Sequence, residues 1–349
     1  MRITKEQITP IDKQNMRKLL VEFPSQVETA IAIGKNASVK LNLKNINSIV
    51  LTGLGGSAIG GDLLRSYLAD ELKIPFYVSR HYFLPNFVNK NSLVIVGSYS
   101  GNTEETISAY KDAIKKGAKI LVVSSGGVVS EMAKKNKHSV VKIPGGLPPR
   151  AALGFSFFPI LVALAKLGIV KNQNKFLTET VKMLKDKSVE YSTENNSAID
   201  LAEKLFKKLP IVFSSADKFD SVNTRWRGQI NENSKQLSYG HVFPELNHNE
   251  IVGWESLTEL MKSSHIIYLR DKADHKRVSL RMNITKSIIG KLSSGVTEVY
   301  SSGNSLLTRI FSVIHLGDWV SLYLAVLNKV DPTPVVKINF LKNELEKIK

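Results

Sequence analysis

Short apolar runs alternate with helical patterns through the first half of the chain. The runs at 48–53, 92–97 and 119–124 are rich in Val, Ile and Leu and end in Gly or Ser. Each run precedes a stretch with apolar residues at helical spacing, which predicts helices at about 59–68, 104–116 and 129–135. Uninterrupted apolar strands are typical of a parallel sheet whose two faces are both covered by helices. This half is therefore predicted to be an α/β lobe.

The second half repeats this alternation less regularly and without a letter-level repeat. Each of its three strand candidates precedes a helical pattern, at 210–215, 265–270 and 297–301. The predicted fold class is α/β, with two doubly wound parallel-sheet lobes (α-β-α sandwiches) packed together. The junction is placed between Gly168 and Asn174, which gives two predicted domains, 1–170 and 171–349.

The segments outside the two lobes also have recognisable patterns. Residues 1–44 are predicted to be mainly helical, with an interruption at Pro24. The apolar run at 151–167 is predicted to be a buried helix, because it is too short and too interrupted to span a membrane. The tail is predicted to contain a turn and a final helix, at 331–335 and 338–347.

Composition narrows the class of protein. The chain has 349 residues, of which 43% are hydrophobic and 23% charged, as expected for a soluble globular protein of two domains. No stretch approaches the ~20 apolar residues that a bilayer span needs, and the N-terminus has no apolar signal segment, so no membrane association is predicted. The absence of cysteine excludes disulfides, thiolate ligands and thiolate nucleophiles, and it favours a cytoplasmic location.

The net charge of +17 raises the question of a nucleic-acid partner. The lysines are spread along helical segments such as 111–116 and 182–187, and no dense basic run with interleaved aromatic residues occurs. A basic solvated surface is therefore the preferred interpretation, and no nucleic-acid partner is predicted. The positive field would also attract a small anionic substrate.

Glycine and hydroxyl residues follow three of the predicted strands, at 53–61, 97–106 and 124–127. Ligands of open α/β sheets bind at the carboxyl ends of the strands, where a glycine lets the backbone approach an anion. Ser98, Ser100 and Thr103 offer three hydroxyls to a phosphate monoester, although N-capping of the following helix remains an alternative for one of them. Ala58 breaks the dinucleotide pattern and the P-loop lysine is missing, so no nucleotide cofactor is predicted.

A second polar concentration lies at 231–235 and 244–250, where carboxylates, amides, a lysine and a histidine crowd together. So many polar groups cannot form a hydrophobic core, and they must face water, one another or a ligand. Spacing alone leaves open a solvated helix and loop as the simpler interpretation.

Together these segments carry a resemblance to a known family. The stretch 97–106 looks like the signature loop of SIS (sugar isomerase) domains, which sugar-phosphate sensors and transferases share. With Gly55 to Ser57, the Pro148-Pro149-Arg150 turn, and the segments 232–235, 244–250 and 331–335, the chain resembles the archaeal-type bifunctional phosphoglucose/phosphomannose isomerases over nearly its whole length. Segment 142–149 departs from the family pattern, because it is longer and richer in Gly and Pro.

The resemblance implies two SIS lobes and a homodimer whose active site lies at the interface. It implies glucose 6-phosphate, mannose 6-phosphate and fructose 6-phosphate as substrates, with no cofactor and no metal. Several residues match the phosphate-binding positions, namely Gly56, Ser57, Ser98, Ser100 and Thr103.

The same resemblance assigns chemical roles. Arg150 matches the arginine that steadies the developing enediolate, and Glu232 matches the proton-transfer base. His248 matches the ring-opening residue, donated by the neighbouring chain. Thr333 and Lys342 match positions near the ring oxygen and open end of the sugar.

Alternatives remain for residues and for function. Glu245 and Glu250 are rival bases, His241 could share the role of His248, and Lys235 is expected to hold Glu232 ionised or aligned. Trp226 is expected in the core rather than under a sugar. A non-catalytic SIS sugar-phosphate sensor and a hexosamine-phosphate isomerase-type lobe protein are the competing functions, although no effector module or amidotransferase domain is evident.

Overall fold

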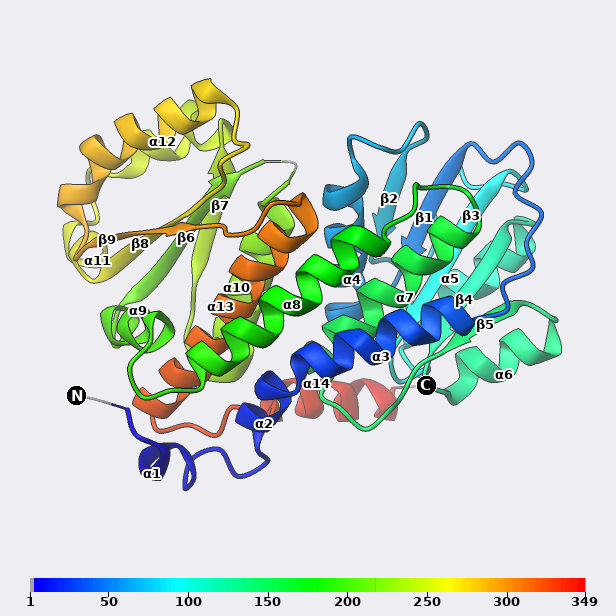
Figure 1. Ribbon diagram of the computed structural model, residues 1–349, viewed down its shortest axis with the longest axis horizontal. Coiled ribbons are helices and arrows are strands. Elements are labelled where there is room, and N and C mark those ends of the chain that lie inside the picture. The colour runs from blue at the N-terminus through cyan, green and yellow to red at the C-terminus, as the bar shows by residue number, and fades with distance from the viewer. Residues whose placement is uncertain (1–2, 217, 349) are drawn as a thin grey trace.

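The computed structural model describes residues 3–216 and 218–348, in which two parallel sheets lie at opposite ends of the molecule (Figure 1). The first sheet has the order β2-β1-β3-β4-β5. Its strands are β1 (Ser48–Thr52), β2 (Phe76–Ser79), β3 (Ser92–Ser98), β4 (Lys119–Ser124) and β5 (Ser139–Lys142). Every residue of β1 and β3 is buried, as expected for strands covered on both faces. The direction of winding reverses between β1 and β3, so a crevice opens at their carboxyl ends.

Helices cover both faces of this sheet. They are α4 (Gly55–Leu68), α5 (Glu104–Lys115), α6 (Gly127–Lys135) and α7 (Leu153–Lys166), and the short helix η1 (Pro149–Ala151) precedes α7. The leading segment forms α1 (Lys5–Ile8), α2 (Met16–Val21) and α3 (Phe23–Asn36). Pro24 lies in the first turn of α3, where its missing N–H leaves no helical bond unmade, so it begins a helix as well as separating two.

The second sheet has the order β7-β6-β8-β9, the same winding as the first four strands of the other sheet. Its strands are β6 (Leu209–Ser215), β7 (Tyr239–Phe243), β8 (Ser264–Arg270) and β9 (Val296–Tyr300). The helices of this half are α8 (Asn174–Tyr191), α9 (Ser197–Leu205), α10 (Asp220–Ser234), α11 (Thr258–Lys262), α12 (Lys276–Ile289), α13 (Leu306–Leu327) and α14 (Val336–Lys347), with the short helices η2 (Glu245–His248), η3 (Glu250–Gly253) and η4 (Gly290–Leu292). The prediction of two parallel-sheet α/β lobes is confirmed, and the boundary at residue 170 stays a prediction.

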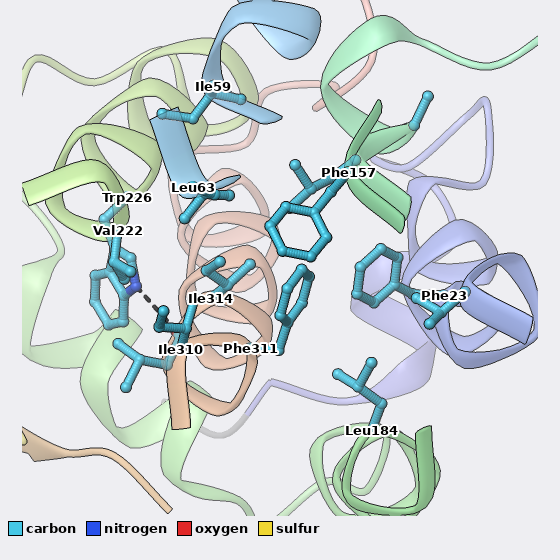
Figure 2. Close-up of a cluster of buried hydrophobic side chains, with 14 of the residues drawn as sticks. Phe23, Ile59, Leu63, Phe157, Leu184, Val222, Trp226, Ile310, Phe311 and Ile314 are labelled. Carbon is cyan, nitrogen blue, oxygen red and sulfur yellow. Dashed lines mark hydrogen bonds between the residues drawn. The ribbon is translucent and has the colours of Figure 1, made fainter. Parts of the chain in front are cut away.

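One hydrophobic cluster joins the two halves (Figure 2). Phe157 of α7 and Phe311 of α13 meet with ring centroids 5.0 Å apart, and Phe23 of α3 stacks on the same ring. Trp226 of α10 is 1% exposed and donates its indole N–H to the Val313 carbonyl at 2.9 Å, so its prediction as a core residue is confirmed. The shared core therefore fixes α10, which carries Glu232, against α13.

Three strands escaped the sequence analysis, namely β2, β5 and β7. All three lie at sheet edges, where only one side makes ladder hydrogen bonds and part of the strand meets solvent. The residues of β7 are mostly exposed or half-buried, and they include Gly240 and His241. Such strands lack the continuous apolar run that marked the central ones, because burial on both faces does not act on them.

The expectation that no stretch approaches the length of a bilayer span is wrong for α13. This helix has 22 residues and a mean hydropathy of 1.7 in its most apolar window, but 89% of that window is buried inside the protein. Its two buried charged residues, Arg309 and Asp318, pair with Asp271 and Arg225 at 2.8 and 2.9 Å. The burial of this helix and the pairing of its charges identify it as a core helix. The sequence pattern alone could not distinguish a long buried core helix from a membrane-spanning helix.

Candidate active site

The loops that follow β1, β3 and β4 touch one another at the crevice of the first sheet. A Cβ on Gly53 would lie 2.6 Å from the Gly97 carbonyl, and one on Gly101 would lie 1.8 Å from the Gly126 carbonyl. Gly101 also has φ +77°, a conformation that favours glycine. These close approaches bring Ser57 of α4 beside Gly97. The predicted hydroxyl-bearing loops are therefore adjacent.

The hydroxyls of these loops do not cap α5. Thr103 is the N-cap residue, yet its side chain accepts no backbone N–H of that helix. Ser98 Oγ accepts from the Gly101 N–H at 3.1 Å, and Ser100 Oγ accepts from the Asn102 N–H at 3.3 Å, so both bonds are local to the loop. The capping alternative is wrong for Thr103. The amino end of α5 therefore keeps its dipole and N–H groups for an anion, although Glu104 and Glu105 in its first turn oppose one in part.

Gly56 joins this anion cradle to the turn that carries Arg150. A Cβ on Gly56 would lie 2.4 Å from the Pro149 carbonyl oxygen and 2.9 Å from its carbon. The first turn of α4 and the short helix η1 are therefore packed backbone to backbone, which only glycine permits. The position of Arg150 is set by the same helix that positions Ser57.

Arg150 is 4% exposed and lies between the two lobes. Its Nε donates to Asn233 Oδ1 at 2.6 Å, and its Nη2 donates to the Pro332 and Thr333 carbonyls at 2.6 and 2.7 Å. Its Nη1 lies 3.5 Å from Glu232 Oε2. Burial lowers the pKa of the Arg150 guanidinium, and the Glu232 carboxylate acts in the opposite direction.

Glu232 stands in the last turn of α10, with 35% of its side chain exposed. The two residues after it anchor the turn, because Asn233 Nδ2 donates to Ser321 Oγ at 2.9 Å and Ser234 Oγ donates to the Ser321 carbonyl at 2.8 Å. The helix also contacts α4 through an Arg65–Asp220 ion pair of 2.6 Å. A carboxylate that faces a buried cation yet reaches solvent can exchange a proton with a bound molecule.

Lys235 contacts the main chain of Glu232, and its expected part in holding Glu232 ionised or aligned stays a prediction. Its ammonium donates to the Glu232 main-chain carbonyl and, at 3.1 Å, to the Pro332 carbonyl, rather than to the Glu232 carboxylate. The residue has φ +54° and ends α10, so the ammonium satisfies a carbonyl that the helix leaves open. Burial lowers the pKa of Lys235, and the nearby Arg150 lowers it further.

The tail at 331–334 packs against Arg150. Thr333 accepts from Arg150 through its main-chain oxygen, and its own N–H donates to Asp331 Oδ1 at 2.9 Å. The Thr333 hydroxyl is buried without a partner among the described residues. A buried hydroxyl without a partner costs free energy, so a ligand that reaches it would gain a hydrogen bond.

His248 and Lys342 are exposed, and no hydrogen bond or ion pair among the described residues joins either to Arg150. His248 ends η2, a segment that packs on α12 through an Asn247–Thr285 hydrogen bond of 2.8 Å. Lys342 lies on α14, whose described residues include none that is buried. Their roles stay predictions.

The rival bases are engaged elsewhere. Glu245 accepts from Asn249 Nδ2 at 2.8 Å, and Glu250 accepts from the Tyr239 hydroxyl at 3.1 Å. Burial raises the pKa of the Glu250 carboxyl. His241 Nδ1 accepts from the Val242 N–H at 2.7 Å. No group of three or more His, Asp or Glu side chains that could hold a metal occurs among residues 3–216 and 218–348.

Sequence reasoning missed two contributors to the site. Asn233 is fully buried against Arg150, and the Pro332 carbonyl is an acceptor that any residue type could supply. Asn233 lies in the polar stretch next to Glu232, but its contact with Arg150 depends on how the two lobes meet, which the sequence does not show. The carbonyls of the tail leave no signal in a sequence.

Comparison with known proteins now gives the family. The model of the bacterial phospho-glucose isomerase C-terminal SIS domain matches residues 194–345, and that of the SIS domain matches residues 42–145. A relative from Caldicellulosiruptor bescii, named bifunctional phosphoglucose/phosphomannose isomerase, is 50% identical over 338 residues, which cover 96% of this chain and 100% of the relative. The chain belongs to the bifunctional phosphoglucose/phosphomannose isomerase family.

Other members of the bifunctional phosphoglucose/phosphomannose isomerase family are more distant. One from Aquifex aeolicus is 37% identical over 311 residues, covering 88% of this chain and 92% of the relative. Among solved structures, a hypothetical protein from Thermus thermophilus matches with a TM-score of 0.70 at 13% identity, covering 96% of this chain and 91% of that one. At that identity the likeness concerns the fold alone.

Proposed function

We propose that this protein is an aldose–ketose isomerase that interconverts glucose 6-phosphate and mannose 6-phosphate with fructose 6-phosphate. Membership of the family supports the substrates. The observation that carries the proposal is the approach of Arg150 Nη1 to Glu232 Oε2, 3.5 Å, at the junction of the lobes. A buried cation beside a solvent-reaching carboxylate is what an enediolate intermediate requires.

The phosphate end of the substrate binds in the hydroxyl-rich loops at the carboxyl ends of β1 and β3. Adjacency of these loops and the free amino end of α5 support this role for a set of residues, Gly56, Ser57, Ser98, Ser100 and Thr103. The phosphate takes no part in the bond changes. Its binding energy holds the reacting carbons near Glu232.

Proton transfer runs between neighbouring carbons of the open sugar. The Glu232 carboxylate takes the proton from C2 of the aldose as the C1=C2 double bond forms, and the carbonyl oxygen gains the negative charge of an enediolate. Glu232 returns the proton to C1, the hydroxyl proton of C2 moves to the oxygen of C1, and the ketone remains. Arg150 stabilises the charge that exists only between the two transfers. No oxidant or cofactor enters this balance.

Ring opening precedes the transfer and needs a proton donor at the ring oxygen. We assign it to His248 of a neighbouring chain, which requires a homodimer with its active site at the interface. The exposure of His248 on η2 supports donation to another chain. Lys342 and Thr333 are proposed to lie near the ring oxygen and the open end, and the unpartnered Thr333 hydroxyl supports its part.

To accept both epimers, the site must bind the sugar without strict recognition of the configuration at C2. Thr333 is small and is proposed to leave room for water beside the C2 hydroxyl, so that either orientation of that hydroxyl is accepted. A cytoplasmic location and the absence of nucleic-acid and membrane partners belong to the same proposal.

The decisive experiment measures formation of fructose 6-phosphate from each aldose by a coupled assay, with wild type and with Glu232→Gln. The variant should lose at least about a thousandfold in kcat on both sugars and should not exchange the C2 proton with solvent. Glu245→Gln and Glu250→Gln are matched controls that should keep exchange.

Two outcomes would overturn the assignment. Exchange retained by Glu232→Gln and lost in a control would move the base to that control residue. A wild type that binds the sugar phosphates without converting them would make the protein a sensor, and conversion of amino-sugar phosphates alone would favour the hexosamine-phosphate function.

A further inference from the structure

Three N–H groups of Arg150 donate hydrogen bonds to acceptors of the protein. The N–H groups that remain without such an acceptor all belong to one nitrogen. A guanidinium has five N–H donors in a planar fork. The Nε–H is taken by Asn233, and both Nη2 donors are taken by the carbonyls of Pro332 and Thr333. The remaining donors belong to Nη1, which faces Glu232 at 3.5 Å. The direction of Nη1 therefore depends on the three acceptors behind it.

Asn233 is the one side chain among these three acceptors. It is 0% exposed, and its Nδ2 donates to Ser321 Oγ at 2.9 Å. The Ser321 hydroxyl proton is already donated to the Asp318 carbonyl at 2.7 Å, so Ser321 can only accept from Asn233. This chain of donors fixes the amide with its oxygen toward Arg150.

We propose that Asn233 is a positioning residue for isomerisation, whose amide oxygen sets the rotation of the Arg150 guanidinium so that Nη1 faces Glu232 and the reacting carbons. The inference rests on the proposed function. The two carbonyls hold only the Nη2 edge of the fork. The bond at Nε holds the planar group at a second nitrogen, so the guanidinium cannot turn about Nη2.

The neutrality of the amide is part of this role. A carboxylate at position 233 would also accept from Nε, but its charge would compensate the charge of Arg150 before the enediolate forms. Glu232 loses its own charge when it takes the proton, so Arg150 then faces the charge of the enediolate, whereas a carboxylate at position 233 would still compensate it. Asn233 orients Arg150 without neutralising it.

The first test compares Asn233→Leu with Ser234→Ala. Both sites are buried in the same turn of α10 and bond to Ser321, but only Asn233 contacts Arg150. We expect kcat of Asn233→Leu to fall about 10- to 100-fold with KM within about twofold of wild type, because misplacement weakens only the transition state. Ser234→Ala loses one of the two bonds that anchor this turn to Ser321 but keeps the bond to Arg150, so it should lose less than about twofold in kcat and keep its KM. Equal losses in the two variants, or a change in KM alone, would reduce Asn233 to a structural residue.

The second test uses Asn233→Asp and the pH profile of kcat/KM. A new negative charge beside the arginine favours the protonated form of Glu232, so the acid limb of the profile should move to higher pH. The other charged groups around this pair are Arg225, Lys235 and Asp331, all unchanged by the substitution. An unmoved acid limb together with wild-type kcat would overturn the proposal.

The third test asks whether Asn233 acts through Arg150. In an Arg150→Lys background, Asn233→Leu should cost less than about twofold more in kcat, because the fork it orients is already gone. Independent, multiplying losses would contradict positioning. Should wild type lack isomerase activity, the proposed function fails first. In that case the melting temperatures of Asn233→Leu, Arg150→Lys and the double variant would still test the contact between the two residues. Non-additive changes in melting temperature would establish the contact, and additive changes would rule it out.

Discussion

Arg150 and Glu232 come from the two different lobes and meet with Nη1 and Oε2 3.5 Å apart. The arginine is held by a turn that rests on α4 of the first lobe, and the carboxylate stands on α10, which rests on α13. The shared hydrophobic core between the sheets therefore sets the distance between the proposed base and its cation (Figure 2). Substitutions that shift either lobe should act on the rate as well as on stability.

Gly56→Ala is predicted to reduce both stability and rate. The new Cβ would lie 2.4 Å from the Pro149 carbonyl oxygen, so α4 and the turn of Arg150 must separate. We expect a loss of about 1–3 kcal/mol in the free energy of unfolding and a fall of about 10- to 100-fold in kcat. Urea unfolding and the coupled assay measure the two effects.

Gly228→Ala is the matched control for that substitution. Gly228 is also in a helix, α10, but a Cβ there meets nothing within 4 Å. It should stabilise the protein by about 0.5–1 kcal/mol and leave kcat unchanged. Wild-type kinetics in Gly56→Ala would contradict the idea that this contact positions Arg150.

Thr103→Val is predicted to raise KM without loss of stability. The Thr103 hydroxyl caps no helix, so its replacement by a methyl should change the free energy of unfolding by less than about 0.5 kcal/mol. A lost hydrogen bond to a charged phosphate is worth about 1.5 kcal/mol or more, a rise in KM of at least about tenfold.

Asn196→Ala provides the opposite control. Asn196 caps α9 by accepting from the Ala198 and Ile199 N–H groups at 2.9 and 3.0 Å. Its loss should cost about 0.5–2 kcal/mol of stability and leave KM unchanged. If Thr103→Val behaved like Asn196→Ala, the hydroxyl would belong to the helix and not to a phosphate site.

The sequence supported the central strands and the anion loops because both have local causes. Burial on two faces demands continuous apolar runs, and close backbone approach at Gly56 and Gly101 demands glycine. These constraints act on individual residues, so they can be recognised in the amino-acid sequence. The predicted site residues Gly56, Arg150 and Glu232 fall into one contiguous region because the core shared by the two lobes brings their elements together.

The features that escaped depend on how elements cross. The Arg150–Asn233 bond exists because α10 meets α4 and the turn of Arg150 across the junction of the lobes, and the Lys235 contacts exist because the tail returns over the end of α10. The roles of His248 and Lys342 depend on a second chain and stay predictions.

The homodimer with shared active sites can be tested by mixing two inactive variants, Glu232→Gln and His248→Asn. Random pairing at equal amounts makes half the dimers mixed, and each mixed dimer has one site with both native residues, so about a quarter of the wild-type rate should return. Co-refolding the two variants and assaying the mixture measures this. Each variant refolded with itself is the control.

Helix α14 supports the need for a second chain. No residue of α14 is buried among those described, and Phe340 and Leu341 are 65% and 58% exposed. A 12-residue helix in water is marginal without packing of its apolar face. Sedimentation that shows a monomer, or mixed dimers that stay inactive, would rule out donation of His248 between chains.

Below about pH 6.5, the free energy of unfolding is predicted to decrease as the pH decreases, because two histidines are buried in their uncharged form. Burial lowers the pKa of His315 to about 3 and, with Lys204 and Lys208 nearby, that of His265 to about 4. In the unfolded chain both titrate near 6.5. Below that pH the unfolded state binds protons that the folded state excludes, so stability is present above 6.5 and is lost as pH falls toward 4.

The expected slope is about 1.4 kcal/mol per pH unit for each histidine between pH 6 and 5. His315→Gln should reduce the slope of the free energy of unfolding against pH by the contribution of one histidine. Ser188→Ala removes the hydroxyl that lies 2.9 Å from His315 Nε2 but leaves the imidazole, so it should lower stability at every pH with the slope preserved. Urea unfolding measured at intervals of half a pH unit distinguishes a change in the pH dependence of stability from a loss of stability that is equal at every pH. Parallel curves for wild type and His315→Gln would show that the folded state already protonates this residue.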